Sequence, residues 1–201
     1  MSETNERNAI RRLMRDRRRQ LNAAERRFAA RLLRNRLLAL PRFRHARNIA
    51  AYHAVDGEML LEPVIETAWS LGIPVYLPCL RRTRMEFRRY TPDTVLVDNR
   101  YGIPEPRPGA GVTINARFLD VVLTPLLAFD PHGARLGTGG GFYDRTFAYL
   151  LHRHAWKRPS LIGVAYTFQQ VPRLPVAPWD VPLHGVVTDA SSHFFRIDGS
   201  T

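Results

Sequence analysis

Apolar residues near the start of the chain recur at helical spacing between many charged residues. This pattern predicts a helix from about Glu6 to Gln20. Its apolar positions are Ile10, Leu13, Met14 and Leu21. Asn22-Ala23-Ala24-Glu25 is a capping-box pattern, so a second helix is expected to begin there and to end before Pro41. The apolar stripe of that helix contains Phe28, Leu32, Leu33 and Leu37.

Short apolar runs further along the chain predict buried strands. They cover residues 48–53, 73–77, 119–123, 161–165 and 185–188, and a looser alternation over 85–90 predicts an edge strand. Helices are expected at Leu60–Leu71, where Gly72 follows the helix, and at Tyr143–Arg153. Residues 98–111 hold three glycines and three prolines, which predicts a long ordered loop.

Strands that alternate with helices indicate a mainly parallel sheet covered on both faces. We find no internal repeat and no linker, so residues 1–201 are expected to form a single three-layer α/β domain. A hydrophobic content of 45% is sufficient for a core of this size.

The composition also bears on the compartment. No apolar run approaches the length of a membrane span, and the polar N-terminus lacks the apolar stretch of a signal peptide. Cys79 is the single cysteine, which excludes an intrachain disulfide, and the seven histidines lack zinc-ligand spacing. These features predict a cytoplasmic protein without a membrane partner.

The formal net charge of +12 is concentrated near the start, because half of the 30 basic residues lie at or before Arg47. Three interpretations are open: nucleic-acid binding, a solvated helix face in an arginine-rich chain, or attraction of anionic substrates. The arginines lack interleaved aromatics and an RNA-recognition signature, which disfavours nucleic acid without excluding it.

The segment 135–145, Arg-Leu-Gly-Thr-Gly-Gly-Gly-Phe-Tyr-Asp-Arg, carries the clearest candidate chemistry. Backbone without Cβ atoms turns sharply and brings N–H groups close to an anion, most often phosphate. Asp144 follows, and a carboxylate near a polyphosphate requires a divalent cation between them. The loop is neither a Walker A motif nor a dinucleotide fingerprint. The alternative is a glycine-rich turn in which Asp144 serves only the helix dipole.

Other candidates follow the predicted strands, where open α/β sheets bind ligands. Residues 53–58 follow the first strand, and Asp180 precedes the last. On spacing alone, Glu58 fits an N-terminal charge on the next helix. Arg7 and Arg11 lie four apart on one helical face, where they form either a phosphate clamp or part of an ordinary basic face.

Five segments together resemble the 5-formyltetrahydrofolate cyclo-ligase (methenyltetrahydrofolate synthetase) family. The most specific is Asp130-Pro131-His132-Gly133-Ala134-Arg135-Leu136-Gly137, continuing through Asp144-Arg145. The others are the basic N-terminal helix, Val55-Asp56-Gly57-Glu58, Gly102-Ile103-Pro104-Glu105-Pro106, and Leu174-Pro175 followed by Trp179-Asp180. They occur in the family's order along nearly the whole chain.

The resemblance implies the α/β fold shared with some sugar-phosphate isomerases and CoA transferases. It implies ATP- and Mg²⁺-dependent cyclisation of 5-formyltetrahydrofolate to 5,10-methenyltetrahydrofolate, with release of ADP and phosphate through a phosphorylated formyl group. Both 5-formyltetrahydrofolate, with or without a polyglutamate tail, and ATP are the expected partners.

The resemblance also implies roles for individual residues, none of them a covalent nucleophile. The expected ATP-binding residues are Arg7, Arg11, Arg135, Leu136, Gly137, Thr138, Gly139, Gly140, Gly141, Phe142 and Tyr143. His53, Glu58 and Phe142 are expected to bind the folate, and Asp144 and Asp180 to hold Mg²⁺. The chain departs from the family pattern at three of these positions: Arg7 replaces a lysine, Gly140 a lysine of some relatives, and Phe142 a tyrosine.

Two other classes of function compete with this enzyme. One is a basic, non-catalytic α/β protein that binds nucleotide or RNA, whose RNA affinity would depend strongly on salt. The other is a sugar-phosphate isomerase on a related fold, which would need no ATP.

Overall fold

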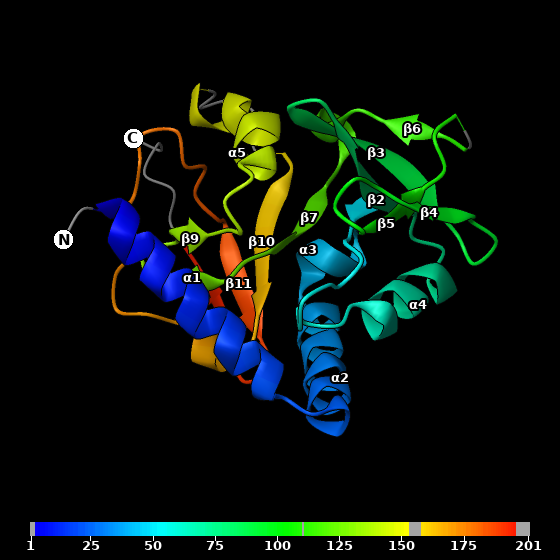
Figure 1. Cartoon of the computed structure of the whole chain (residues 1–201). Helices are drawn as coiled ribbons and strands as arrows, with labels where there is room; N and C mark the ends of the chain where they lie inside the picture. Colours follow the sequence, from blue (N-terminus) through cyan, green and yellow to red (C-terminus); the bar gives the residue numbers. More distant parts are fainter. Residues whose placement is uncertain (1–2, 110, 153–157, 196–201) are drawn as a thin grey trace.

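The structure, a computed structural model, describes residues 3–109, 111–152 and 158–195. A central sheet has the strand order β12-β11-β10-β7-β1-β2-β3-β6 (Figure 1). The strands of this sheet are β1 (Ile49–Ala50), β2 (Val75–Arg81), β3 (Arg84–Tyr90), β6 (Thr113–Ile114), β7 (Val121–Pro125), β10 (Ser160–Ala165), β11 (Gly185–Thr188) and β12 (Ser192–Phe194). Two small antiparallel pairs accompany it, β4 (Leu96–Asp98) with β5 (Pro104–Pro106), and β8 (Ala128–Phe129) with β9 (Arg135–Leu136).

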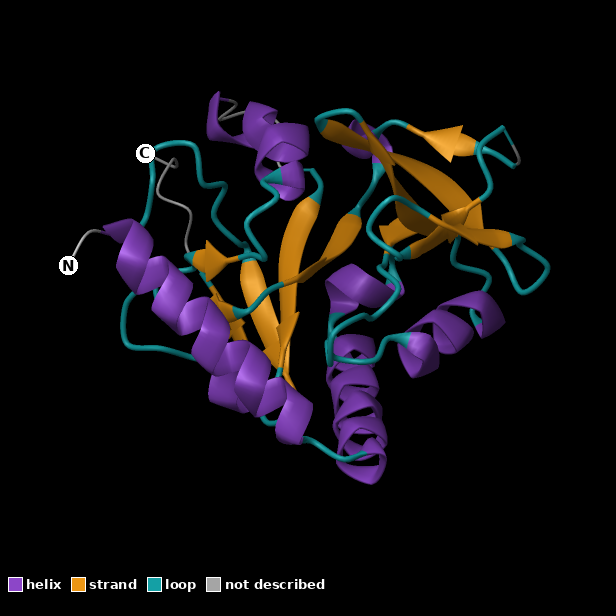
Figure 2. Ribbon diagram, in the orientation of Figure 1, coloured by secondary structure: helices purple, strands orange, loops and turns teal. Residues whose placement is uncertain are grey.

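The helices of the described ranges lie around this sheet (Figure 2). They are α1 (Glu3–Gln20), α2 (Ala23–Ala39), α3 (Pro41–Arg44), α4 (Glu62–Ser70) and α5 (Phe142–Phe147). Short 3₁₀ segments cover Ala116–Phe118, Ala148–His152 and Thr167–Gln169. No helix in these ranges is both long and apolar enough to cross a membrane.

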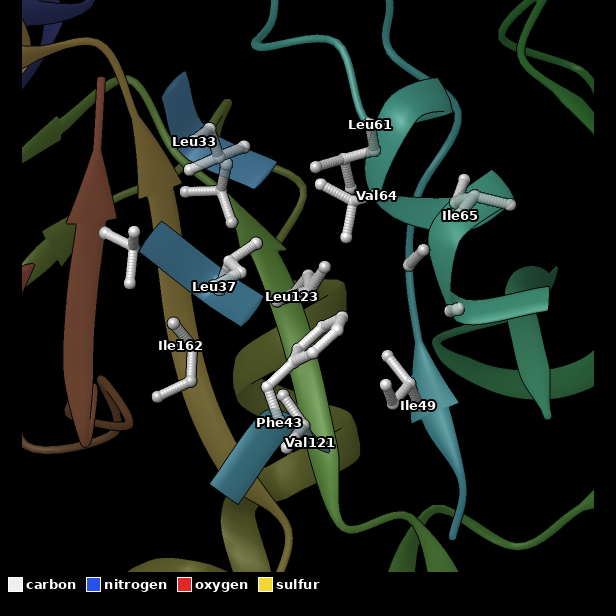
Figure 3. Packing of buried hydrophobic residues seen from close by; sticks show 14 of the residues in the cluster. Leu33, Leu37, Phe43, Ile49, Leu61, Val64, Ile65, Val121, Leu123 and Ile162 are labelled. Atoms are coloured by element: carbon white, nitrogen blue, oxygen red, sulfur yellow. The ribbon is translucent and has the colours of Figure 1, made fainter. Parts of the chain in front are cut away.

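Strand residues alternate between two buried faces, which gives the three layers predicted from the sequence. Val121 and Leu123 of β7 pack on one face with α2, α3 and α4 (Figure 3). Val122 points to the other face, where α5 packs. The neighbouring parallel strands repeat this alternation. A sheet buried on both faces accounts for the nearly continuous apolar runs in the sequence.

The parallel part of the sheet contains a topological switch point. β1 pairs in parallel with β2 on one side and with β7 on the other, and β10 and β11 follow beyond β7. The chain order therefore reverses between β1 and β7. In open α/β sheets, the crevice at such a point, at the carboxyl ends of the strands, is where ligands bind.

The sequence prediction was right about most elements and wrong in several details. Strand β3 is not an edge strand, because β6 pairs with it on its outer side. Residues 98–111 are not only loop, since β5 forms within them. The helix at Tyr143 ends at Phe147 and continues as a 3₁₀ segment, and its expected end at Arg153 lies outside the described residues. Leu13 is 55% exposed, although its spacing placed it on the apolar face.

The predicted capping box is present and sets the start of α2. The Asn22 side chain accepts hydrogen bonds from the backbone N–H groups of Ala24 and Glu25, while the Glu25 carboxylate accepts one from the Asn22 backbone. Helix α2 then places Leu33 and Leu37, both fully buried, against the sheet. Gly72, with a φ of +71°, follows α4 as expected of a residue just past a helix.

We predict that Leu33→Ala lowers the free energy of unfolding by about 2–5 kcal/mol, because truncation leaves a cavity beneath α2. Urea unfolding followed by circular dichroism measures this loss. Leu13→Ala is the matched control, and it should cost less than about 0.5 kcal/mol because the side chain is exposed. Equal costs for the two variants would contradict the packing described here.

Candidate functional site

A cavity of about 1010 Å³ lies at the carboxyl ends of β1 and β7. Its wall contains residues from three distant segments, namely the turn after β1, the glycine-rich loop before α5, and the loop at Asp180. Every residue that the sequence assigned to ATP, folate or Mg²⁺ lies in this wall except Leu136. The Leu136 side chain is buried in the core against Met14 and Leu127.

A hairpin of two short strands presents the glycine-rich loop. Asp130, 1% exposed, closes the turn between β8 and β9 by accepting hydrogen bonds from the N–H groups of His132 and Ala134 through one carboxylate oxygen. Its second oxygen accepts from the Leu174 N–H, which ties the hairpin to the loop that leads to Asp180. The family-like signature thus begins with a residue whose role here is structural.

The loop itself needs its glycines for conformation. Gly139 has a φ of +111° and Gly141 a φ of +63°, values that strain residues with a Cβ atom. A Cβ atom on Gly141 would also lie 2.6 Å from the Arg145 guanidinium. This arrangement fits a loop whose backbone is open to a ligand on the cavity side.

Arginines of α1 reach the same loop. The Arg11 Nε donates a hydrogen bond to the Gly137 carbonyl at 3.0 Å, and the Arg15 guanidinium lies 3.5 Å from the Thr138 carbonyl. Partial burial, together with Arg7 and Arg15 nearby, lowers the pKa of Arg11. A cluster of positive charge beside a glycine-rich loop favours an anionic ligand.

The two aspartates expected to hold Mg²⁺ are neighbours, and each is paired with an arginine. Asp144 lies 2.6 Å from Arg135, and Asp180 lies 3.1 Å from Arg7. The same Asp144 oxygen accepts a hydrogen bond from the backbone N–H of Val181, the residue after Asp180. The free protein therefore neutralises both carboxylates with its own cations.

These carboxylates fit Mg²⁺ better than a metal that needs a full protein cage. Among the described residues, no group of three or more His, Cys, Asp or Glu side chains could hold a metal ion. Two aspartates supply hard oxygen ligands, and Mg²⁺ commonly completes its shell with water and substrate phosphate.

Glu58 follows a tight turn at the other side of the cavity. Asp56 and Gly57 both have positive φ, 46° and 73°, and the Glu58 N–H donates to the Val55 carbonyl at 3.0 Å. Its carboxylate turns back into the loop and accepts from the Val55 N–H at 3.1 Å. The next helix, α4, begins at Glu62, so Glu58 does not act as its N-terminal charge.

Burial dominates the electrostatics of this carboxylate. Glu58 is 7% exposed, and desolvation raises its pKa to about 7, although the Val55 N–H and Arg18 act in the opposite direction. A carboxyl group with a pKa near 7 is unusual, and groups whose pKa is strongly shifted concentrate at functional sites.

Sequence reasoning missed several residues of the site region, among them Tyr101, Arg145 and Arg18. Tyr101 and Arg145 line the cavity; the Tyr101 ring meets Phe142 edge-on at 6.2 Å, and the Arg145 guanidinium lies over Phe142. Arg18 lies beneath the turn at Glu58. The sequence did contain a signal for Arg18. Ile10, Met14 and Arg18 are spaced four residues apart, which places Arg18 on the same, buried face of α1.

The fold and the cavity together define an α/β protein with a glycine-rich loop and a buried glutamate at one switch point. The sequence profile of the 5-formyltetrahydrofolate cyclo-ligase family matches residues 3–189. The chain is 39% identical to 5-formyltetrahydrofolate cyclo-ligase of Haemophilus influenzae, over 92% of this chain and 98% of the relative. It is 38% identical to the Escherichia coli protein of the same name, over 88% and 96%.

A solved structure of Aquifex aeolicus 5,10-methenyltetrahydrofolate synthetase is similar in fold, with a TM-score of 0.81 and 30% identity. The match covers 97% of this chain and 95% of that one. The chain therefore belongs to the 5-formyltetrahydrofolate cyclo-ligase family.

We predict that Glu58→Gln becomes more stable relative to wild type as pH rises. Folding raises the Glu58 pKa from 4.5 to about 7, so the folded state retains a proton that the unfolded state loses in this window. The contribution of Glu58 to the free energy of unfolding of the wild type is therefore fully present below pH 4.5, and it is lost as the pH rises to about 7.

The difference in free energy of unfolding between the two proteins should change by about 1–3 kcal/mol between pH 4.5 and pH 8. Urea titrations at several pH values measure it. A difference independent of pH would contradict the burial of an ionisable Glu58.

Proposed function

We propose that this chain catalyses the ATP- and Mg²⁺-dependent cyclisation of 5-formyltetrahydrofolate to 5,10-methenyltetrahydrofolate. The observation that carries the proposal is that one cavity brings together the glycine-rich loop and the buried Glu58 turn. A site for ATP at the loop and a site for a reduced folate at Glu58 would then share one cavity, as direct transfer of a phosphoryl group requires.

The chemistry of the reaction explains why ATP and the folate must be bound side by side. A formamide oxygen is a poor leaving group, and phosphoryl transfer from ATP converts it to a phosphate ester, with ADP as the first product. Attack by N10 on the formyl carbon then closes a five-membered ring, N10 loses its proton, and phosphate departs with the former formyl oxygen. Such a reaction depends mainly on positioning and charge neutralisation.

Two groups of residues, at two ends of the cavity, would bind the two substrates. The backbone from Gly137 to Gly141, with Arg11 and Arg135, would hold the phosphates of ATP. Glu58, His53 and Phe142 would line the folate site, where a carboxylate accepts hydrogen bonds from pterin N–H groups.

Asp144 and Asp180 would hold Mg²⁺. When bound, the ion would neutralise phosphate charge during transfer. Arg7 and Arg135 pair with these carboxylates, and both would lie within reach of phosphate oxygens if Mg²⁺ were held there. A cytoplasmic location remains a prediction from the sequence.

The test is absorbance of the methenyl product after the purified protein is mixed with 5-formyltetrahydrofolate, ATP and Mg²⁺. We expect product only when all three are present, with one ADP formed per methenyl group. Product without ATP, or ATP hydrolysis without product, would contradict the proposal.

We predict that Arg11→Ala weakens binding of an ATP analogue by about ten- to hundredfold, because a charge-assisted hydrogen bond contributes about 1.5–3 kcal/mol. Calorimetry measures this affinity. Arg12→Ala is the matched control, since it removes the same charge from an exposed position of α1. Arg15 and Arg18 are unsuitable controls because both contact Asp56. Equal losses at positions 11 and 12 would indicate a diffuse charge effect.

We predict that Asp144→Asn folds normally but lowers kcat by at least about a hundredfold, because it removes a charge expected to hold the cation. Asparagine retains an acceptor oxygen for Arg135 and Val181. Asp16→Asn, on the exposed face of α1, should leave kcat unchanged. A wild-type rate and Mg²⁺ dependence in Asp144→Asn would remove Asp144 from the metal site.

A further inference from the structure

Arg18 is a buried cation in a helix whose other arginines are at least partly exposed. Its side chain is 1% exposed, and it occupies the same face of α1 as Met14, which is 2% exposed. Burial of a guanidinium is costly unless carboxylates and hydrogen-bond acceptors compensate for the lost water. A contribution to surface charge cannot explain a buried arginine, so its contacts must account for it.

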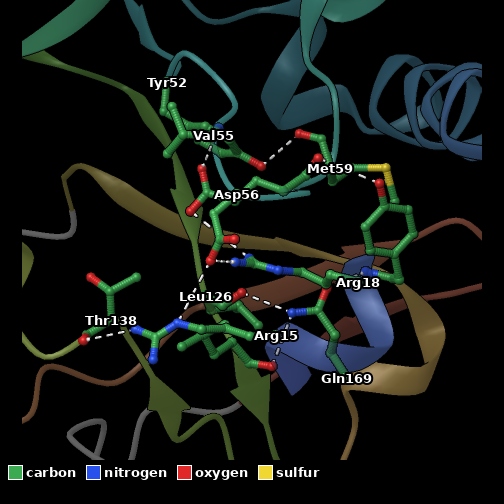
Figure 4. A network of polar contacts seen from close by, with 12 residues as sticks. Arg15, Arg18, Tyr52, Val55, Asp56, Met59, Leu126, Thr138 and Gln169 are labelled. Carbon is green, nitrogen blue, oxygen red and sulfur yellow. Dashed lines mark hydrogen bonds and ion pairs between the residues drawn. The ribbon is translucent and has the colours of Figure 1, made fainter. Parts of the chain in front are cut away.

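Those partners are the two acids of the turn at Glu58. One Arg18 nitrogen lies 3.4 Å from an Asp56 oxygen, and another lies 3.9 Å from a Glu58 oxygen. The Arg18 Nε has no hydrogen-bond partner. The guanidinium therefore contacts the turn through its two terminal nitrogens only. Figure 4 shows Arg18 reaching Asp56 from α1.

The turn is seated directly on this part of the helix. A Cβ atom on Gly57 would lie 3.2 Å from the Arg18 Cβ and 3.3 Å from its carbonyl oxygen. Only glycine, with its positive φ, allows the turn to approach so closely. Arg18 and the turn are thus fixed relative to each other by backbone contact as well as by charge.

Arg18 is the cation among the charged and titratable groups that face Glu58. The other groups that face Glu58 are Asp56 in its own turn, Tyr52 on the side of the sheet, and Tyr143 in α5. In addition, the Tyr166 hydroxyl donates a hydrogen bond to the Glu58 backbone carbonyl. Burial raises the pKa of Glu58, and Arg18 is one of the two groups that oppose this rise. Loss of Arg18 would raise the pKa of the Glu58 carboxyl further and would leave the Val55 N–H as the remaining group that opposes the effect of burial.

We propose that Arg18 is a positioning residue for folate recognition, which acts through Glu58 by holding that carboxylate in position at the cavity and favouring its charged form. The proposal rests on the function proposed above, in which Glu58 accepts hydrogen bonds from the pterin. Arg18 itself is absent from the cavity wall, so it reaches the substrate only through Glu58.

The experiment compares Arg18→Met with Arg12→Met, which makes the same change on the exposed face of α1. Binding of 5-formyltetrahydrofolate and of Mg-ATP is measured separately by calorimetry, from pH 6 to pH 9. We expect Arg18→Met to weaken folate binding at pH 7 by about ten- to hundredfold, with ATP binding unchanged. The pH above which folate binds tightly should move upward, whereas Arg12→Met should behave as wild type.

A double-mutant cycle separates this role from a general structural one. In a Glu58→Gln background, Arg18→Met should change folate affinity by less than about threefold, since the residue through which it acts is gone. A full effect in that background would overturn the proposal, as would equal weakening of folate and ATP. Should Arg18→Met not fold, Arg18→Lys decides: it should bind folate with intermediate affinity, and wild-type affinity would overturn the role.

The outcomes also distinguish this proposal from the proposed function. Wild-type folate binding in Glu58→Gln would place Glu58 outside the folate site and overturn the Arg18 proposal, whereas the proposed function is overturned separately, if wild-type protein forms no methenyl product from 5-formyltetrahydrofolate, ATP and Mg²⁺. A weakened Glu58→Gln beside an unaffected Arg18→Met would overturn only the positioning role of Arg18.

Discussion

Contacts of helix α1 with two loops hold the candidate site together. Arg11 hydrogen-bonds the glycine-rich loop at Gly137, Arg18 and Arg19 pair with Asp56 in the acidic turn, and Arg15 lies within reach of both loops. Each loop contains residues with positive φ and lies outside the strands, so hydrogen bonds within the sheet do not determine its position. The relative position of the expected ATP and folate sites therefore depends on one helix packed across the carboxyl edge of the sheet.

This arrangement changes the meaning of the high positive charge. Arg7, Arg15, Arg18 and Arg19 are engaged with Asp180 or Asp56, so part of the basic N-terminal segment organises the protein's own acids. Arg11, in contrast, lines the cavity and contacts the Gly137 carbonyl and not an acid, so its positive charge suits an anionic substrate such as a polyphosphate. Of the three interpretations of the charge, attraction of anionic substrates thus gains structural support, while nucleic-acid binding gains none from the contacts seen here.

The sequence predicted the fold well where local patterns determine it. Asn22 and Glu25 defined the start of α2 through a capping box, and apolar runs defined the parallel strands because both faces of that sheet are buried. The β4–β5 pair was missed because Pro104 and Pro106 mask a strand pattern, and β12 because Ser192–Phe194 is short and exposed. The site residues came mostly from the family resemblance, since spacing alone left Glu58 and Asp144 ambiguous. Arg18 was missed because a helix rich in arginine gives little indication of which one is buried.

We propose that a single cavity binds both substrates, with phosphate at the glycine-rich loop and the pterin at Glu58. The decisive measurement is a crystal structure of the protein with 5-formyltetrahydrofolate and a non-hydrolysable ATP analogue. We expect γ-phosphate density beside the Gly137–Gly141 backbone, facing the formyl oxygen, and pterin N–H groups within hydrogen-bond distance of the Glu58 carboxylate. A pterin bound away from Glu58, or phosphates bound away from the loop, would contradict it.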